Sequence, residues 1–148
     1  MKRFFLTLFI ALTLCLSACA DGRPITFEQL PANAQTIITQ NFVRENILFV
    51  TVDTDLFSTE YEVRFNDGKE LDFDGNGNLK KVDCQYERVP DALIPAQVLQ
   101  QVQASYPNAF IVEWKLDDGQ WKAELNNTLE LVFNKRYQLV GIDDLIKE

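Results

Sequence analysis

Residues 61–79 read YEVRFNDGKELDFDGNGNL, and this stretch predicts two short β-strands with the turns that follow them. Apolar residues alternate with charged ones, which are Glu62 and Arg64 in the first strand and Glu70 and Asp72 in the second. Strict alternation indicates strands with one buried face and one solvated face. The Asn-Asp-Gly and Asp-Gly-Asn-Gly segments favour hairpin turns. We therefore expect an antiparallel meander here.

A helical pattern precedes these strands. Pro31 suits the first position of a helix, because its missing N–H would have no partner there. Just before it, Thr26 and Gln29 fit a capping box at a short turn. The apolar residues of this region recur with helical spacing, namely Leu30, Ala34, Ile37, Ile38 and Phe42. This stripe predicts a helix that covers the apolar face of the meander.

The same order of elements returns in the second half of the chain. Ile94-Pro95 takes the place of Leu30-Pro31, and Phe133 takes the place of Phe73. Self-similarity of this kind is typical of a structural unit that is written twice. We therefore predict an α+β fold of two tandem repeats, each a helix packed on a four-stranded antiparallel meander. The expected repeats occupy residues 21–88 and 89–148.

The two halves share one irregularity and differ in one turn. Leu79 and Val82 are spaced three apart at the end of the first half, as are Leu139 and Ile142 at the end of the second. This break in alternation predicts a β-bulge in the last strand of each half. The stretch 54–60 is a long turn, whereas its counterpart Asp118-Gly119-Gln120 is tight.

The N-terminus has the pattern of an export signal. Lys2 and Arg3 precede an apolar run over residues 4–16, and small residues follow. The run is short for a membrane span, so residues 1–20 are excluded from the fold. We expect an exported protein that is periplasmic, attached to the outer membrane or cell surface, or secreted.

Two processing routes remain open for this signal. Leu16-Ser17-Ala18-Cys19 resembles a lipobox, in which Cys19 would be lipidated and would anchor the chain to a membrane. Ala18-Cys19-Ala20 also fits a cleavage site that leaves Asp21 as the first residue. The first route gives an anchored protein and the second a free one.

The composition excludes several classes of function. The formal net charge is −8, and it becomes −10 once Lys2 and Arg3 are removed, so nucleic acid and anionic lipid are repelled. Contact with a membrane is expected only through the lipid anchor. The sequence has no histidine, which excludes Ser-His-Asp and Cys-His catalysis and zinc sites with imidazole ligands. We expect neither an enzyme nor a cofactor. Cys84 lies in an alternating strand, where a buried, inert thiol is expected.

The segment 72–83 has the spacing of a calcium loop. Asp72, Asp74, Asn76 and Asp83 stand where such a loop places oxygen ligands. Lys80 and the lack of a final Glu depart from that pattern. Because the alternation makes this segment a strand, a turn and a returning strand, a hairpin without calcium is the competing interpretation.

Taken together, the export signal and the paired helix-and-meander patterns resemble those of the PepSY-like family, also described as beta-lactamase-inhibitor-like. The similarity lies in the Leu-Pro and Ile-Pro helix starts, in Tyr61-Glu62-Val63 with Phe73-Asp74, and in the Asn76-Gly77 turn. It implies an envelope or extracellular protein with the architecture of beta-lactamase inhibitory protein. It supplies no set of functional residues for these positions.

The expected function is a non-catalytic binding module of the cell envelope or exterior that engages a protein partner through its open sheet face and loops. The alternatives are an inhibitor of a secreted hydrolase, either a beta-lactamase or a protease, and a calcium-binding structural protein. Aromatic residues off the core face or on loops suit contact with a partner. The candidate contact residues are Phe49, Phe57, Glu62, Arg64 and Phe110.

Overall fold

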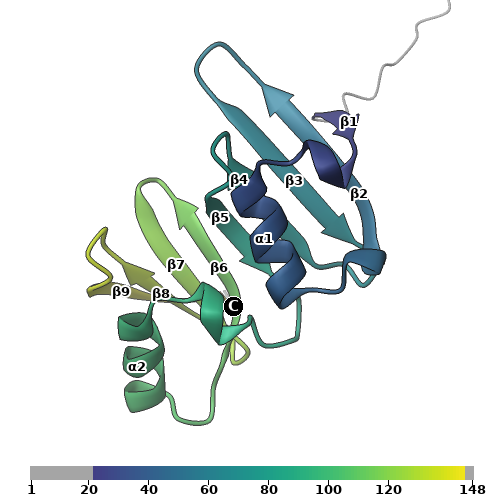
Figure 1. Ribbon diagram of the computed structural model, residues 1–148. Helices are drawn as coiled ribbons and strands as arrows, with labels where there is room; N and C mark the ends of the chain where they lie inside the picture. The colour runs from purple at the N-terminus through teal and green to yellow at the C-terminus, as the bar shows by residue number, and fades with distance from the viewer. Residues whose placement is uncertain (1–21, 146–148) are drawn as a thin grey trace, which may run out of the picture.

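The computed structural model of the chain describes residues 22–145, and the expected signal segment with Cys19 lies outside them (Figure 1). Two α-helices and three short 3₁₀ segments connect nine strands in this part of the chain. The strands are β1 (Arg23–Ile25), β2 (Ile47–Thr54), β3 (Thr59–Phe65), β4 (Glu70–Asp74), β5 (Leu79–Asp83), β6 (Ile111–Asp117), β7 (Gln120–Leu125), β8 (Leu129–Phe133) and β9 (Leu139–Asp144). The helices are α1 (Ala32–Asn41) and α2 (Ala96–Ser105), and the 3₁₀ segments are η1 (Phe27–Gln29), η2 (Arg44–Asn46) and η3 (Asp91–Leu93).

All nine strands belong to a single antiparallel sheet in the order β1 to β9. The halves are joined where β5 pairs with β6 through Lys81↔Lys115, Val82↔Trp114 and Asp83↔Glu113. The prediction of two tandem repeats, each a helix on its own four-stranded meander, is therefore wrong. Side-chain alternation reports which face of a strand is buried, but it does not report which strand edges pair. Pairing at this junction satisfies backbone groups that two separate meanders would leave exposed.

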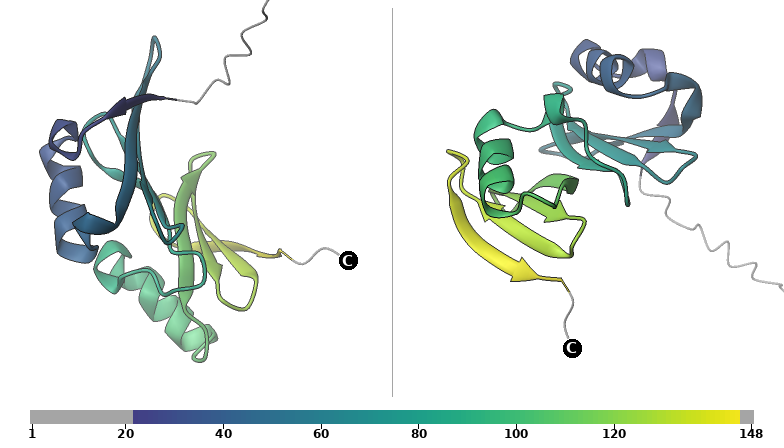
Figure 2. Two further views of the ribbon diagram at one scale, coloured as in Figure 1. Left: turned by 90° about the vertical axis from the view of Figure 1, so that its right-hand side faces the viewer. Right: turned by 90° about the horizontal axis from the view of Figure 1, so that it is seen from below.

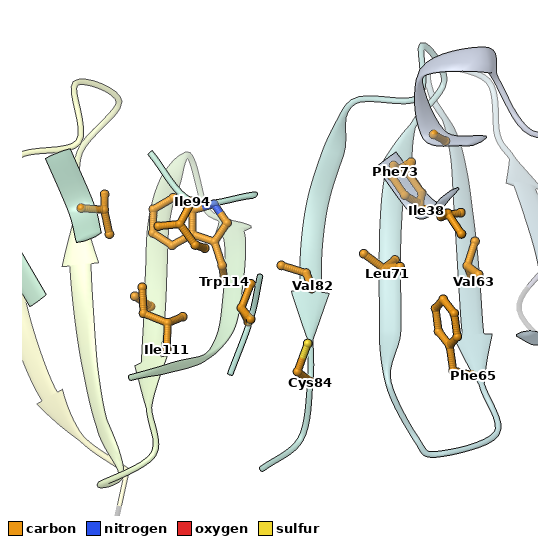
Figure 3. Packing of buried hydrophobic residues seen from close by; sticks show 14 of the residues in the cluster. Ile38, Val63, Phe65, Leu71, Phe73, Val82, Cys84, Ile94, Ile111 and Trp114 are labelled. Carbon is orange, nitrogen blue, oxygen red and sulfur yellow. The ribbon is translucent and has the colours of Figure 1, made fainter. Parts of the chain in front are cut away.

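Both helices lie on the same face of the twisted sheet, and the opposite face carries no helix among the described residues (Figure 2). Ala34 and Ile38 of α1 and Val98 and Val102 of α2 are buried against the sheet. They join one apolar cluster that runs across both halves and includes Val63, Leu71, Val82 and Trp114 (Figure 3). No helix in the described part of the chain is long and apolar enough to cross a membrane.

Trp114 occupies the centre of the junction. It is 2% exposed and lies opposite Val82 across the β5–β6 pair. Its ring stacks on Trp121 with centroids 4.8 Å apart and meets the edge of Phe133 at 6.0 Å. A large aromatic side chain at this position joins the apolar surfaces of the two halves.

Most of the local structural predictions made from the sequence are confirmed. The helices begin at Ala32 and Ala96, so Pro31 and Pro95 occupy the N-cap position, one residue before the first helical position that was expected for them. Both expected bulges are present, because the register shifts beside Phe73 and beside Phe133. Cys84 is buried, as expected. The expected difference between the two turns is present, because residues 55–58 separate β2 from β3, whereas only Asp118 and Gly119 separate β6 from β7.

The Gly-rich turn between β4 and β5 packs beneath the start of α1. Gly77 has a φ of +79°, and a Cβ built there would lie 2.8 Å from Pro31 Cβ and 2.9 Å from Ala34 N. The Asn33 amide donates a hydrogen bond to the Gly77 carbonyl oxygen at 2.9 Å. Only glycine allows both this backbone conformation and this close approach.

Because the two halves share one sheet and one core, we expect them to unfold together. Trp114→Ala should lower the free energy of unfolding by about 3–5 kcal/mol, as expected for removal of a buried tryptophan. Urea denaturation followed by far-UV circular dichroism should show one transition in both proteins. Two separate transitions, with only the later one sensitive to the substitution, would contradict a shared core. Tyr86→Ala, at a residue that is 90% exposed, is the control and should shift stability by less than about 0.5 kcal/mol.

Gly77→Ala should destabilise the protein by about 2 kcal/mol or more, because the methyl group clashes with the first turn of α1 and the residue must keep a positive φ. Gly75→Ala is the matched control in the same turn. Its Cβ would meet only ordinary contacts, at 3.4 Å from Thr59. Thermal unfolding of both variants measures the difference, and equal melting temperatures would refute the packing role of Gly77.

Candidate functional site on the open face of the sheet

The open face, opposite the helices, carries a line of acidic residues across six neighbouring strands. Each strand from β4 to β9 contributes one residue, and each residue lies directly opposite the next: Glu70↔Asp83, Asp83↔Glu113, Glu113↔Glu124, Glu124↔Glu130 and Glu130↔Asp143. We call these six residues the carboxylate row. Like charges directly opposite each other destabilise a sheet, so this arrangement needs compensation.

Lysines of the adjacent row on the same face provide that compensation. Lys81, Lys115 and Lys122 are themselves cross-strand neighbours along β5, β6 and β7. Lys81 Nζ lies 2.9 Å from an oxygen of Glu70, and Lys122 Nζ lies 3.8 Å from Glu130. The face therefore consists of a negative line beside a shorter positive line.

Compensation is least complete in the middle of the carboxylate row. Glu130 is 7% exposed, and its nearest cations lie 3.8–3.9 Å away. Glu113 Oε1 is buried and has no partner with hydrogen-bond geometry, although Lys115 Nζ lies 2.7 Å from it. Burial, followed by the charge of Glu113, raises the pKa of the neighbouring Glu124 carboxyl. These three carboxylates therefore hold negative charge that the chain itself only partly satisfies.

A hollow of about 390 Å³ opens on this face beside the β5–β6 junction. Glu60 and Asp72 line one side, and Lys115 and Asp117 line the other. The hollow forms because β5 and β6 pair only over residues 81–83, whereas β6 continues to Asp117. Burial, followed by the charge of Glu70, raises the pKa of Asp72 to about 7. One wall of the hollow can therefore change its charge near neutral pH.

The four residues of the candidate calcium loop do not converge. The Asp74 carboxylate accepts hydrogen bonds from the backbone N–H groups of Asn76 and Asn78 and from the Asn78 amide, each at 2.9 Å. Asp72 lies opposite Lys81, and Asp83 lies opposite Glu70 at the far end of the same strand pair. Among the described residues, no group of three or more acidic or cysteine side chains is placed to hold a metal ion. The carboxylate of Asp74 caps a hairpin turn.

The five candidate contact residues fall in three places. Glu62 and Arg64 form an ion pair at 2.8 Å on the open face, and Arg64 also reaches Glu70 at 2.5 Å, at the end of the carboxylate row. Phe49 lies opposite Arg64 at the same end and is 40% exposed. Phe57 lies at the tip of the β2–β3 hairpin.

Phe110 lies on the helix side of the sheet. The guanidinium of Arg88 is placed 5.1 Å from the centre of its ring. Both residues line a groove of about 450 Å³ beside α2, together with Leu99 and Val102. The structure therefore brings Phe49, Glu62 and Arg64 together and leaves Phe57 and Phe110 elsewhere.

Most of the carboxylate row was missed by sequence reasoning. Alternation places Glu70, Glu124 and Glu130 on the solvated faces of separate strands, but it does not bring them together, and it does not single out Glu113. They become neighbours only through cross-strand register. The available signal was that each is an acid flanked by buried apolar residues, as Glu124 is by Ala123 and Leu125.

Comparison with known proteins gives one family and several solved structures. A family model described as "Putative beta-lactamase-inhibitor-like, PepSY-like" matches residues 59–140. A crystal structure from Bacteroides thetaiotaomicron, described as a "putative calcium-regulated periplasmic protein", is 34% identical with a TM-score of 0.77, and the match covers 83% of this chain and 97% of that one. No curated protein matches the chain.

Two further crystal structures come from Bacteroides vulgatus. The first, described as a "putative periplasmic protein", is 32% identical with a TM-score of 0.79, and the match covers 84% of this chain and 98% of that one. The second, a "putative periplasmic protein of unknown function", is 27% identical with a TM-score of 0.73, and the match covers 80% and 95% of the two chains. The fold is thus shared over nearly the whole length of each solved structure.

The raised pKa of Asp72 makes stability depend on pH. Below the unfolded value of 3.8 both states hold the proton, and above about 7 both have lost it, so the cost of ionising Asp72 in the fold accumulates between these limits as pH rises. Asp72→Asn should therefore be more stable than the wild type by on the order of 2 kcal/mol above pH 7, after allowance for solvent screening. The difference should shrink toward zero near pH 4.

Urea denaturation across this pH range measures the effect. Asp53→Asn, which changes an exposed residue of the same sheet, is the control and should show no such pH-dependent gain. A stability difference for Asp72→Asn that stays constant with pH would contradict burial of the charge.

Proposed function

Because the chain belongs to the PepSY-like, beta-lactamase-inhibitor-like family, we propose that it is a non-catalytic binding module of the periplasm that engages a protein partner through the open face of its sheet. The solved relatives are described as periplasmic proteins, which supports an exported location. A periplasmic location agrees with the export pattern of residues 1–20.

The observation that carries this proposal is the carboxylate row. It is a line of acidic residues on a sheet face over which no helix of the described chain lies. Adjacent strands are about 4.8 Å apart, so six strands present a line of roughly 24 Å. That length corresponds to about seven residues of extended chain. A partner segment rich in lysine and arginine would complete the charges that Glu113, Glu124 and Glu130 leave partly satisfied.

The attachment of the module belongs to the same proposal. We take Cys19 of the lipobox to be lipidated, so that the short tether up to Gly22 joins the sheet to a membrane. Mass spectrometry of the mature N-terminus tests this. Acylated Cys19 is the expected first residue, and an unmodified Asp21 would exclude the anchor.

Inhibition of a secreted hydrolase is the second candidate function. The description of the family favours it, and so does the β2–β3 hairpin, which projects beyond the rest of the sheet (Figure 1). Stoichiometric loss of activity in a panel of beta-lactamases and secreted proteases would support it. Full activity of the whole panel in excess protein would remove it.

One of the solved relatives is described as calcium-regulated, so a calcium site in this chain has to be considered. The residues of this chain do not fit a calcium site in the β4–β5 turn, because the Asp74 carboxylate is already bonded to three N–H donors. No step of the proposed function therefore depends on calcium.

Neutralising the middle of the row should abolish partner binding. We expect the triple variant Glu113→Gln, Glu124→Gln, Glu130→Gln to lose the partner that wild-type protein captures from a periplasmic extract. The matched control removes the same charge from exposed acids outside the row, with Glu45→Gln, Asp91→Asn and Asp118→Asn.

Quantitative mass spectrometry of the captured proteins distinguishes the outcomes. A basic protein that is retained by the wild type and the control, but reduced at least tenfold by the row variant, supports the proposal, since tenfold corresponds to about 1.4 kcal/mol. Equal recovery with all three proteins would exclude the row as the contact surface.

A further inference from the structure

The tip of the β2–β3 hairpin presents two adjacent apolar side chains to solvent. Leu56 is 92% exposed and Phe57 is 95% exposed. They lie beyond the ends of the strands, at Thr54 and Thr59, and beyond the apolar core. Figure 1 and the left view of Figure 2 show this hairpin extending past the neighbouring strands. Single exposed apolar residues need no explanation, whereas contiguous exposed apolar groups with polar residues around them suit a contact site.

Three backbone N–H groups of the tip are hydrogen-bonded within the turn. The carboxylate of Asp55 accepts hydrogen bonds from the N–H groups of Phe57 and Ser58, each at 2.7 Å. The Asp55 N–H donates to the Ser58 carbonyl oxygen at 3.0 Å. A turn whose N–H groups are satisfied in this way can enter an apolar environment at a lower cost than an open loop. The tip therefore combines apolar side chains with a backbone suited to leaving water.

The tip and the start of β1 lie at the same end of the sheet. β1 runs antiparallel to β2, with Arg23 opposite Val52 and Ile25 opposite Val50. The start of β1 thus faces the end of β2 that leads into the tip. Cys19 precedes Gly22 by only three residues, which span at most about 10 Å. A lipid on Cys19 would hold this end of the sheet close to the membrane.

We propose that Leu56 and Phe57 insert into the interface of the membrane to which Cys19 is anchored, so that the domain is held at two points. The inference rests on the lipid anchor proposed above. Asp53, Asp55 and Glu60 are exposed around the tip, so the surface it fits is a zwitterionic lipid layer. The hairpin strands then stand upright on the membrane. The carboxylate row, which begins beside Arg64, faces the aqueous compartment roughly 20 Å from the tip.

Fluorescence quenching by lipid tests this arrangement. Ser58→Cys and Tyr86→Cys are each labelled with bimane in the lipidated chain, which is then reconstituted into phosphatidylcholine vesicles with nitroxide on their acyl chains. Tyr86 follows β5 at the opposite end of the sheet and is 90% exposed, so it is the matched reference. The native Cys84 does not interfere, because burial raises the pKa of its thiol to about 11. We expect severalfold stronger quenching at position 58 than at position 86.

Two changes sharpen the result. Leu56→Ser with Phe57→Ser should remove the difference between the labels, and replacing phosphatidylcholine by anionic phosphatidylglycerol should reduce it. Equal quenching at positions 58 and 86 would mean that the tip lies in water or in a protein pocket. Either result would overturn the proposal. Mass spectrometry reports separately on Cys19. If Cys19 is unmodified, the proposed anchor fails, while the labelled chain mixed with the same vesicles still decides the membrane contact of the tip.

Discussion

The pairing of β5 with β6 is the contact on which the rest of the structure depends. It consists of three residue pairs, with Val82 and Trp114 facing each other on the apolar side. Through this short junction the strands of both halves become one sheet with one core. Its brevity matters as well, because β6 runs on beyond the end of the pairing and leaves the hollow lined by Asp72 and Lys115.

The junction also aligns the charges of the open face. Asp83 and Glu113 meet across it, and this contact makes the carboxylate row continuous from β4 to β9. A sequence selected only for stability would alternate charges along this line, since opposed like charges weaken a sheet. The lysines of the adjacent row reduce the repulsion, but they leave the charges of Glu113 and Glu130 incompletely compensated. Local departures from stabilising patterns are expected where a protein meets a partner, which is why we propose this face as the binding surface.

The two ends of the sheet differ in chemistry. One end carries the exposed Leu56 and Phe57 beside the start of β1, and the start of the carboxylate row, at Glu70 next to Arg64, lies toward the other. Because the row crosses the strands at right angles, a domain that stands upright on its hairpin would hold the row parallel to the membrane surface and at a distance from it. Anchor, membrane contact and partner surface would thus occupy separate parts of one rigid scaffold.

The sequence by itself determined the elements and their buried faces. Alternation around Val63 and Leu71 placed the strands, the helical stripe through Ile38 placed α1, and the slips at Leu79 and Leu139 predicted bulges that the structure contains. It also determined the absence of histidine chemistry. Only the tertiary structure decided that the strands form one sheet, that the Gly77 turn supports a helix, and that six dispersed acids form a row. The physical reason is that side-chain period reports on the face of a single strand, whereas edge pairing and register are contacts between strands distant in sequence.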